Sequence, residues 1–268
     1  MPDVWATFNE LDARMQERLA GVLETRGADS RQQEMRRAFL EDIPFPADAH
    51  VLEAGCGTGV LTRVLARTPN VATVVGIDVA PALLSKARDL AADLTNVTFQ
   101  EADARSLPFQ DETFDVVVFD STLTHVPGPE RALTETFRVL RPQGYLAAFD
   151  GDYATTTVAL GDHDPLQTCA DSMMANSVNN RWLGRRLPAL VRSCGFDIQG
   201  FGSHGFVETT ESAYMLTIVE RGADILLASG QIGEETAAAL KAEARRRVAA
   251  GAFFGHIAYV SVIARKPS

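Results

Sequence analysis

The strongest constraint on this 268-residue chain is a set of three alternating glycines, Gly55, Gly57 and Gly59. The apolar residues 51–52 precede them, and a helical pattern over residues 60–65 follows. Glycine allows a sharp turn, and it lets a ligand approach the backbone without a Cβ in the way. Free N–H groups at the start of the helix favour an anionic group such as a carboxylate or a phosphate. The stretch therefore predicts a strand, a tight turn and a helix around a nucleotide-like ligand.

Strand and helix patterns alternate over residues 49–150, which predicts an α/β fold with a doubly wound parallel sheet. The expected strands are His50–Ala54, Val71–Ile77, Asn96–Glu101, Thr113–Asp120 and Tyr145–Phe149. The expected helices between them are Thr58–Arg67, Pro81–Leu94 and Glu130–Arg141. Beyond this region we expect a helix at Trp182–Cys194, a strand at Asp197–Val207, helices at Tyr214–Leu227 and Glu234–Ala249, and a last strand at Phe253–Ala264.

Acidic residues stand near the ends of the first two expected strands. Asp78 follows the glycine turn by about twenty residues, and a carboxylate there can accept hydrogen bonds from both ribose hydroxyls of a nucleotide. Glu53 lies two residues before the first glycine. The Gly-x-Gly-x-Gly spacing differs from the fingerprint of NAD-dependent dehydrogenases, which disfavours NAD as the ligand.

With these residues, positions 49–150 resemble the class I S-adenosylmethionine (SAM)-dependent methyltransferases, and within them the small-molecule group that includes the ubiquinone and menaquinone C-methyltransferases. Residues 138–146, with their Pro-Gln-Gly turn, resemble the family's link into its fifth strand, although many relatives have two glycines after the proline. The resemblance implies a Rossmann-like sheet of seven strands, one of them antiparallel. It also implies SAM as cofactor and methyl transfer to an O, N or C atom of a small molecule.

The resemblance also assigns site residues. The methionine end of SAM would lie on Glu53, Gly55 and Gly57, the ribose on Asp78, and the adenine on Asp103 beside the small Ala104. Further cofactor contacts are expected from Cys56, Gly59, Val79 and Ser121.

Two residues are candidates for catalysis. His125 lies in a sequence like the family's Leu-His-His-Val-x-Asp-Pro region and is a candidate general base. Tyr153 could bring an aromatic face or a hydroxyl to the acceptor. Methyl transfer depends mainly on positioning and on exclusion of water, so it needs no nucleophile motif. Metal-ligand spacings such as Cys-x-x-Cys are absent from the sequence, and we expect no metal.

We expect three segments: a helical cap at residues 1–43, a SAM-binding core at 44–150, and a segment at 151–268 that forms a substrate lid and completes the same domain. Ser30 is a candidate cap for the second helix of the first segment. The polar stretch 154–180 is interpreted as a loop and a short helix over the pocket. The side chains expected to be solvated are Arg31, Arg36 and Arg37.

Composition limits the partners. A formal net charge of −10 argues against nucleic acid or an anionic membrane face as partner, although it allows a local basic pocket. Three cysteines suggest reduced thiols and a cytoplasmic location, and no run approaches the ~20 apolar residues that span a bilayer. The sequence leaves open whether the chain forms a homodimer. A SAM-fold protein with a non-methylating reaction, or a non-catalytic SAM-binding module, would keep the same motifs.

Overall fold

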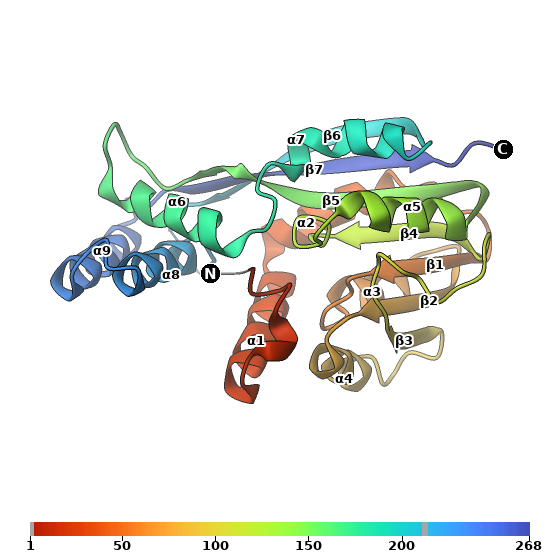
Figure 1. Cartoon of the computed structure of the whole chain (residues 1–268), viewed down its shortest axis with the longest axis horizontal. Helices are drawn as coiled ribbons and strands as arrows, with labels where there is room; N and C mark the ends of the chain where they lie inside the picture. The colour runs from red at the N-terminus through yellow and green to blue at the C-terminus, as the bar shows by residue number, and fades with distance from the viewer. Residues whose placement is uncertain (1–2, 211–213) are drawn as a thin grey trace.

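The computed structural model describes residues 3–210 and 214–268, so the first two residues of the expected cap and residues 211–213 of the expected lid lie outside it. Its strands form one seven-stranded sheet in the order β3-β2-β1-β4-β5-β7-β6 (Figure 1). Strands β1 to β5 are parallel, and β7 runs antiparallel to both its neighbours, β5 and β6. The predicted α/β class and the single antiparallel strand are confirmed. The strands are β1 (Ala49–Ala54), β2 (Val71–Asp78), β3 (Val97–Glu101), β4 (Phe114–Asp120), β5 (Leu140–Thr157), β6 (Asp197–Glu208) and β7 (Gly255–Arg265).

Helices cover both faces of the sheet, which explains why its central strands β1 and β4 have apolar residues facing both sides. Val51 and Val116 lie opposite each other and pack with α2 and α3 on one face. Their neighbours Leu52 and Val117 pack with α5 and α7 on the other face. The helices named here are α2 (Ser30–Glu41), α3 (Val60–Leu65), α5 (Pro129–Val139) and α7 (Leu183–Ser193).

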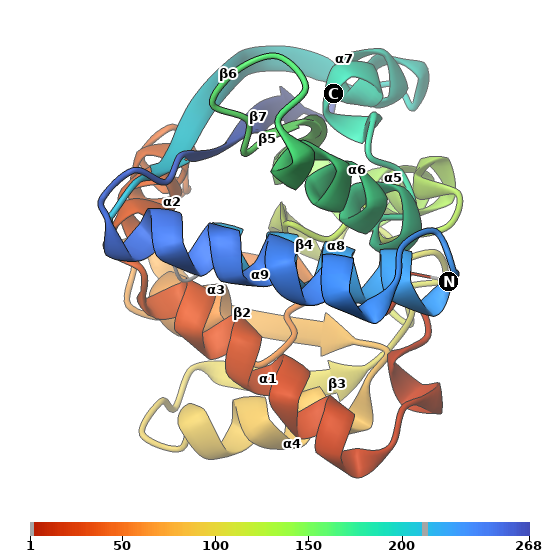
Figure 2. The ribbon, with the colours of Figure 1, turned by 90° about the vertical axis from the view of Figure 1, so that its left-hand side faces the viewer.

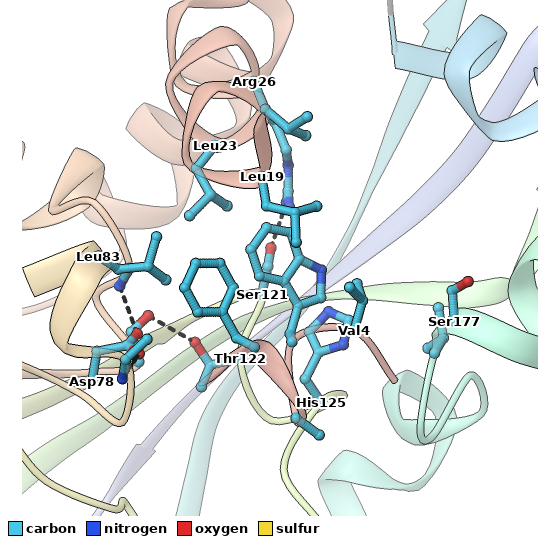
Figure 3. A pocket seen from close by; sticks show the side chains of 18 of the residues that line it. Val4, Leu19, Leu23, Arg26, Asp78, Leu83, Ser121, Thr122, His125 and Ser177 are labelled. Carbon is cyan, nitrogen blue, oxygen red and sulfur yellow. Dashed lines mark hydrogen bonds between the residues drawn. The ribbon is translucent and has the colours of Figure 1, made fainter. Parts of the chain in front are cut away.

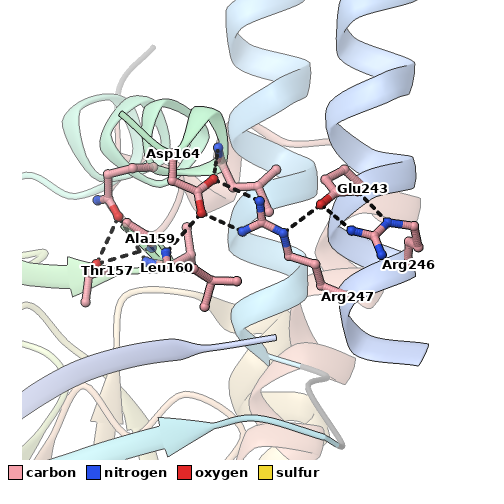
Figure 4. A network of polar contacts seen from close by, with 10 residues as sticks. Thr157, Ala159, Leu160, Asp164, Glu243, Arg246 and Arg247 are labelled. Atoms are coloured by element: carbon pink, nitrogen blue, oxygen red, sulfur yellow. Dashed lines mark hydrogen bonds and ion pairs between the residues drawn. The ribbon is translucent and has the colours of Figure 1, made fainter. Parts of the chain in front are cut away.

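The remaining helices lie mainly at one end of the sheet. They are a short 3₁₀ helix (Phe8–Glu10), α1 (Ala13–Ala28), α4 (Pro81–Leu90), α6 (Pro165–Ser177), α8 (Tyr214–Ala228) and α9 (Glu234–Ala249). Figure 2 shows α6, α8, α9 and α1 stacked across this end of the molecule. Arg247 of α9 binds Asp164, which also caps the first turn of α6, and pairs with Glu243 on its own helix (Figure 4). The Arg247–Asp164 pair joins α9 to α6, and α8 packs against both helices.

The structure corrects three sequence predictions, two of them in this region and one in α2. Strand β5 does not end at Phe149, because β7 pairs with it as far as Thr157. The stretch 154–180 is therefore the end of a strand followed by the thirteen-residue helix α6, and not a loop with a short helix. Its polar residues hid the strand, because the partner strand comes about a hundred residues later. In α2 the cap is Asp29, whose side chain accepts from the Gln32 N–H, and not Ser30.

Candidate active site

A pocket of about 600 Å³ opens where β1, β2, β3 and β4 end. Its floor contains the glycine turn after β1, Asp78 at the end of β2, and Ser121 directly after β4. Its walls come from α1, α6, α8 and the first described residues of the chain. Figure 3 shows Asp78 and Thr122 on one side of the pocket and the hydrogen-bonded pair Arg26 and Ser121 on another. This is the edge where open α/β sheets bind their ligands.

The glycine turn needs glycine for its shape. Gly55 and Gly57 have φ of +77° and +53°, a region that L side chains rarely adopt. A Cβ on Gly55 would lie 2.2 Å from the Thr122 methyl group. Gly55, Cys56 and Gly57 line the pocket as expected. The structure does not place Gly59 there: it begins α3 in a left-handed conformation, and a Cβ on it would meet Phe99 and the Ala87 methyl group.

Asp78 and Asp103, the two carboxylates expected to bind the nucleotide, both line the pocket, but their pKa values shift in opposite directions. Asp78 accepts from the Gly57 and Ala80 N–H groups at 2.8 and 3.0 Å, yet burial raises the pKa of its carboxyl. Asp78 is half-buried and faces the pocket. Asp103 is instead bound by the Arg105 guanidinium, with Nη2 2.6 Å from Oδ2, and this pair lowers its pKa. The small neighbours Val79 and Ala104 line the same edge.

Glu53 is buried beside the turn and is 2% exposed. Burial raises the pKa of its carboxyl to about 8, against the opposing hydrogen bond that Thr62 Oγ1 donates. The nearby Asp120 carboxylate raises it further. Glu53 therefore holds a proton at neutral pH.

A buried ion pair joins the second helix to the end of β4. Arg36 Nε lies 2.6 Å from Asp120 Oδ2, and both side chains are less than a tenth exposed. The expectation that Arg36 is solvated is wrong, because the inner face of α2 turns it toward the strand ends. Burial raises the pKa of Asp120, but Arg36 and Arg26 outweigh that effect and lower it. Arg26 Nη2 also donates to Ser121 Oγ at 2.5 Å.

The structure brings the two candidate catalytic residues together. The rings of His125 and Tyr153 lie 6.1 Å apart between centroids, and both residues line the pocket. His125 Nδ1 is 2.6 Å from Asp3 Oδ2, and Asp3 also accepts from the Asn179 and Trp5 N–H groups. Burial raises the pKa of Asp3, but the hydrogen bond and charge of His125 outweigh it and lower that pKa. Burial raises the pKa of Tyr153 well above its usual value, so its hydroxyl stays protonated.

Comparison with known proteins identifies the family. A family model described as a methyltransferase domain matches residues 52–148. The demethylmenaquinone methyltransferase of Tropheryma whipplei is 35% identical over 124 residues, which are 46% of this chain and 51% of that protein. The phthiotriol/phenolphthiotriol dimycocerosates methyltransferase of Mycobacterium tuberculosis is 33% identical over 184 residues, covering 62% of this chain and 67% of that protein. This chain belongs to the class I SAM-dependent methyltransferases.

A solved structure adds to this family assignment. The [4+2]-cyclase SpnF superposes with a TM-score of 0.57 and is 26% identical, covering 90% of this chain and 84% of that one. This chain spans about half the length of most of the curated methyltransferases that it matches. The predicted family is thus confirmed, and the shared part is centred on the sheet and its glycine turn.

The pocket has groups that suit a carboxylate, which SAM, the cofactor of this family, carries at its methionine end. Buried polar atoms with no hydrogen-bond partner among the described residues face that region: Arg26 Nε, Arg36 Nη1 and Thr58 Oγ1. Since buried donors are nearly always bonded, a ligand with a carboxylate would satisfy them. A methionine carboxylate is such a group, and the neighbouring Asp120 suits an ammonium group.

Several residues of the candidate site were not anticipated from the sequence. Asp120 ends a buried strand as Asp78 does, so the same argument from strand ends could have found it. Arg26 and Asp3 carry no comparable signal in the sequence. Other polar residues near the sheet lie outside the pocket and have partners of their own. Asp150 accepts a hydrogen bond from Thr124, Asp152 forms an ion pair with Arg185, and His204 is hydrogen-bonded to Ser261.

Proposed function

We propose that this protein transfers a methyl group from SAM to a small-molecule acceptor. The observation that carries the proposal is the convergence of one turn and three strand ends on a single pocket, which presents Gly57, Asp78, Asp103 and Asp120 together. Family membership supplies the chemistry, and the geometry supplies the place for it. SAM, when bound, provides an electrophilic methyl group on a sulfonium.

Each protein group then has a defined task at the cofactor. Asp78 would accept hydrogen bonds from ribose hydroxyls while it keeps the turn N–H groups. Arg36 and Asp120 would hold the two charged groups of the methionine end. Asp103 would serve the adenine side only together with Arg105, because the guanidinium already binds both of its carboxylate oxygens.

The acceptor side supports proton removal by His125. The Asp3 carboxylate accepts from Nδ1–H, and the tautomer inferred from that bond leaves Nε2 as a proton acceptor. Such a base serves an acceptor hydroxyl or another group that must lose a proton. Tyr153, which stays protonated, can donate a hydrogen bond but not take a proton. Asp3 acts as a positioning residue for His125.

The first described residues of the chain and α6 would exclude water from the pocket. Val4 and Trp5 lie against the pocket on one side, and Met173 and Met174 of α6 on another. This supports the division into a cap at 1–43, a core at 44–150 and a lid within 151–268, which we retain as a proposal. A cytoplasmic location, the absence of a nucleic-acid partner and a homodimer stay predictions. Among the described residues, no helix has the length and apolarity to cross a membrane.

A second candidate is a non-methylating reaction in a SAM-type pocket. The similarity to SpnF, a [4+2]-cyclase by its description, favours it over a purely non-catalytic role. The same residues would then position a substrate for ring closure, and no base would be required. A screen that measures S-adenosylhomocysteine formation separates this candidate from methyl transfer.

The first test is calorimetric titration with SAM, S-adenosylhomocysteine and NAD, followed by a methyl-transfer screen of small metabolites. Micromolar binding of the first two ligands without NAD supports the site. Arg36→Gln should weaken binding of both at least tenfold, because a hydrogen bond to a charged group is worth about 1.5–3 kcal/mol. Arg37→Gln, on the exposed face of the same helix, is the matched control. Binding of NAD alone would contradict the proposal.

A further inference from the structure

Some of the arginines that line the pocket have a hydrogen-bond or ion-pair partner, and others have none. Among the described residues these are Arg18, Arg26, Arg36, Arg105 and Arg221. Arg36 pairs with Asp120, Arg105 pairs with Asp103, and Arg26 donates to Ser121. The side chains of Arg18 and Arg221 make no hydrogen bond or ion pair in the part of the chain that the structure describes.

These two arginines come from two different helices that line the pocket. Arg18 lies on α1 and is exposed, and Arg221 lies on α8 and is half-buried. Burial lowers the pKa of Arg221 and outweighs the opposing effect of Tyr214. The charge of Arg18 adds to this lowering, and Asp3, which is already bound to His125, opposes it. A half-buried cation beside a like charge is unfavourable until an anion joins it.

The acidic residues of α8 do not neutralise the two cations. Glu220 pairs with Arg245 of α9 at 2.6 Å, and Asp224 pairs with Lys241 of the same helix. Helix α9 therefore takes up the negative charges of α8. Arg221 is left facing the pocket with positive charge.

The surface around the two arginines is apolar. Met173 and Met174 of α6 and Ile218 and Ile225 of α8 line the same part of the pocket. Together with Val178 they offer a surface for a hydrocarbon body.

We propose that Arg18 and Arg221 bind an anionic group on the acceptor, and that the acceptor is therefore an apolar molecule bearing a carboxylate or a phosphate monoester. The guanidinium fork matches either group. This inference rests on the proposed function, because it names the substrate class of the same pocket. The protein as a whole is acidic, so the anion site is local.

The test compares three probes by calorimetry: decanoate, decyl phosphate and the uncharged methyl decanoate. Each is titrated into the full chain with and without S-adenosylhomocysteine. At least one anionic probe should bind tenfold or more tightly than the ester, and high salt should reduce this preference. The probe that binds more tightly shows whether a carboxylate or a phosphate is preferred. Equal affinity for all three, or no binding of any, overturns the inference.

Variants locate the effect. Arg221→Gln and the double variant Arg18→Gln/Arg221→Gln should lose the preference for the anion and keep their affinity for S-adenosylhomocysteine. Arg14→Gln removes the same charge from an exposed position of α1 outside the pocket, so it is the matched control and should keep the preference. If Arg14→Gln loses the preference for the anionic probe as fully as Arg221→Gln does, the assignment of the anion site to Arg18 and Arg221 is overturned. If the wild type does not bind S-adenosylhomocysteine, the proposed function is contradicted. The comparison of the three probes still decides whether the anion site exists.

Discussion

Replacing Glu53 by glutamine should remove a large part of the pH dependence of this protein's stability. The carboxyl of Glu53 is buried beside the glycine turn and accepts a hydrogen bond from Thr62 Oγ1. Burial raises its pKa to about 8, from an ordinary value of 4.5. In the unfolded chain the same carboxyl is in water and titrates near the ordinary value.

Between these two pH values the folded protein holds a proton that the unfolded chain has lost. The free energy of unfolding of the wild type therefore falls as the pH rises from about 4.5 to about 8. Each pH unit in this window is worth about 1.4 kcal/mol, so the whole window is worth about 4–5 kcal/mol at most. Glutamine is neutral at every pH and has nearly the same shape, so the variant lacks this contribution.

The assay is urea unfolding, followed by the fluorescence of Trp5 and Trp182, at several pH values. The stability of Glu53→Gln relative to wild type should increase by roughly 3 kcal/mol between about pH 5 and about pH 8. Glu41→Gln, on the exposed side of α2, should show no such trend. Parallel pH curves for wild type and Glu53→Gln would show that the buried carboxyl is not protonated, and the argument would fail.

Three further predictions concern the pocket and its lid. Asp78→Ala should weaken SAM binding at least tenfold in calorimetry, because hydrogen bonds to a charged group are lost, and unchanged affinity would contradict the ribose assignment. Asp3→Asn should lower kcat while SAM affinity stays unchanged, because the imidazole of His125 loses the carboxylate that orients it; a change in Tm with unchanged kcat would indicate a purely structural role. Gly222→Ala should destabilise by about 1–3 kcal/mol or more in thermal unfolding, since its Cβ would lie 1.9 Å from a backbone oxygen of α6. Gly21→Ala, with open space around it, should be neutral or stabilising, and similar Tm values for the two variants would refute the clash.

Much of the fold could be predicted because local patterns report on parallel sheets. The run at residues 116–118 is apolar at every position because helices cover both faces of β4, and the turn at Gly55 and Gly57 marks the first crossover. Asp78 and Asp103 follow from their position at strand ends. These features depend only on short segments and on the order in which they occur.

The missed residues depend on long-range packing, which a sequence pattern does not contain. Arg36 lies on an amphipathic helix, but the pattern does not show which strand end its inner face meets. Asp3 reaches His125 across more than a hundred residues, and nothing near Asp3 marks it. Arg221 belongs to the pocket because α8 packs over it, and the sequence pattern does not show where α8 packs.

The position of β7 bears on how the protein is made. It is the last strand in chain order, yet it lies between β5 and β6. During synthesis the strands β1 to β4 can therefore form early, while β5 keeps an unpaired edge until β7, which is made after β6 and the end helices, pairs with it. Such an edge can pair with other chains. The nascent chain is thus exposed to aggregation in this interval, and a chaperone that shields β5 should raise the yield of protein without altering the stability of the finished fold.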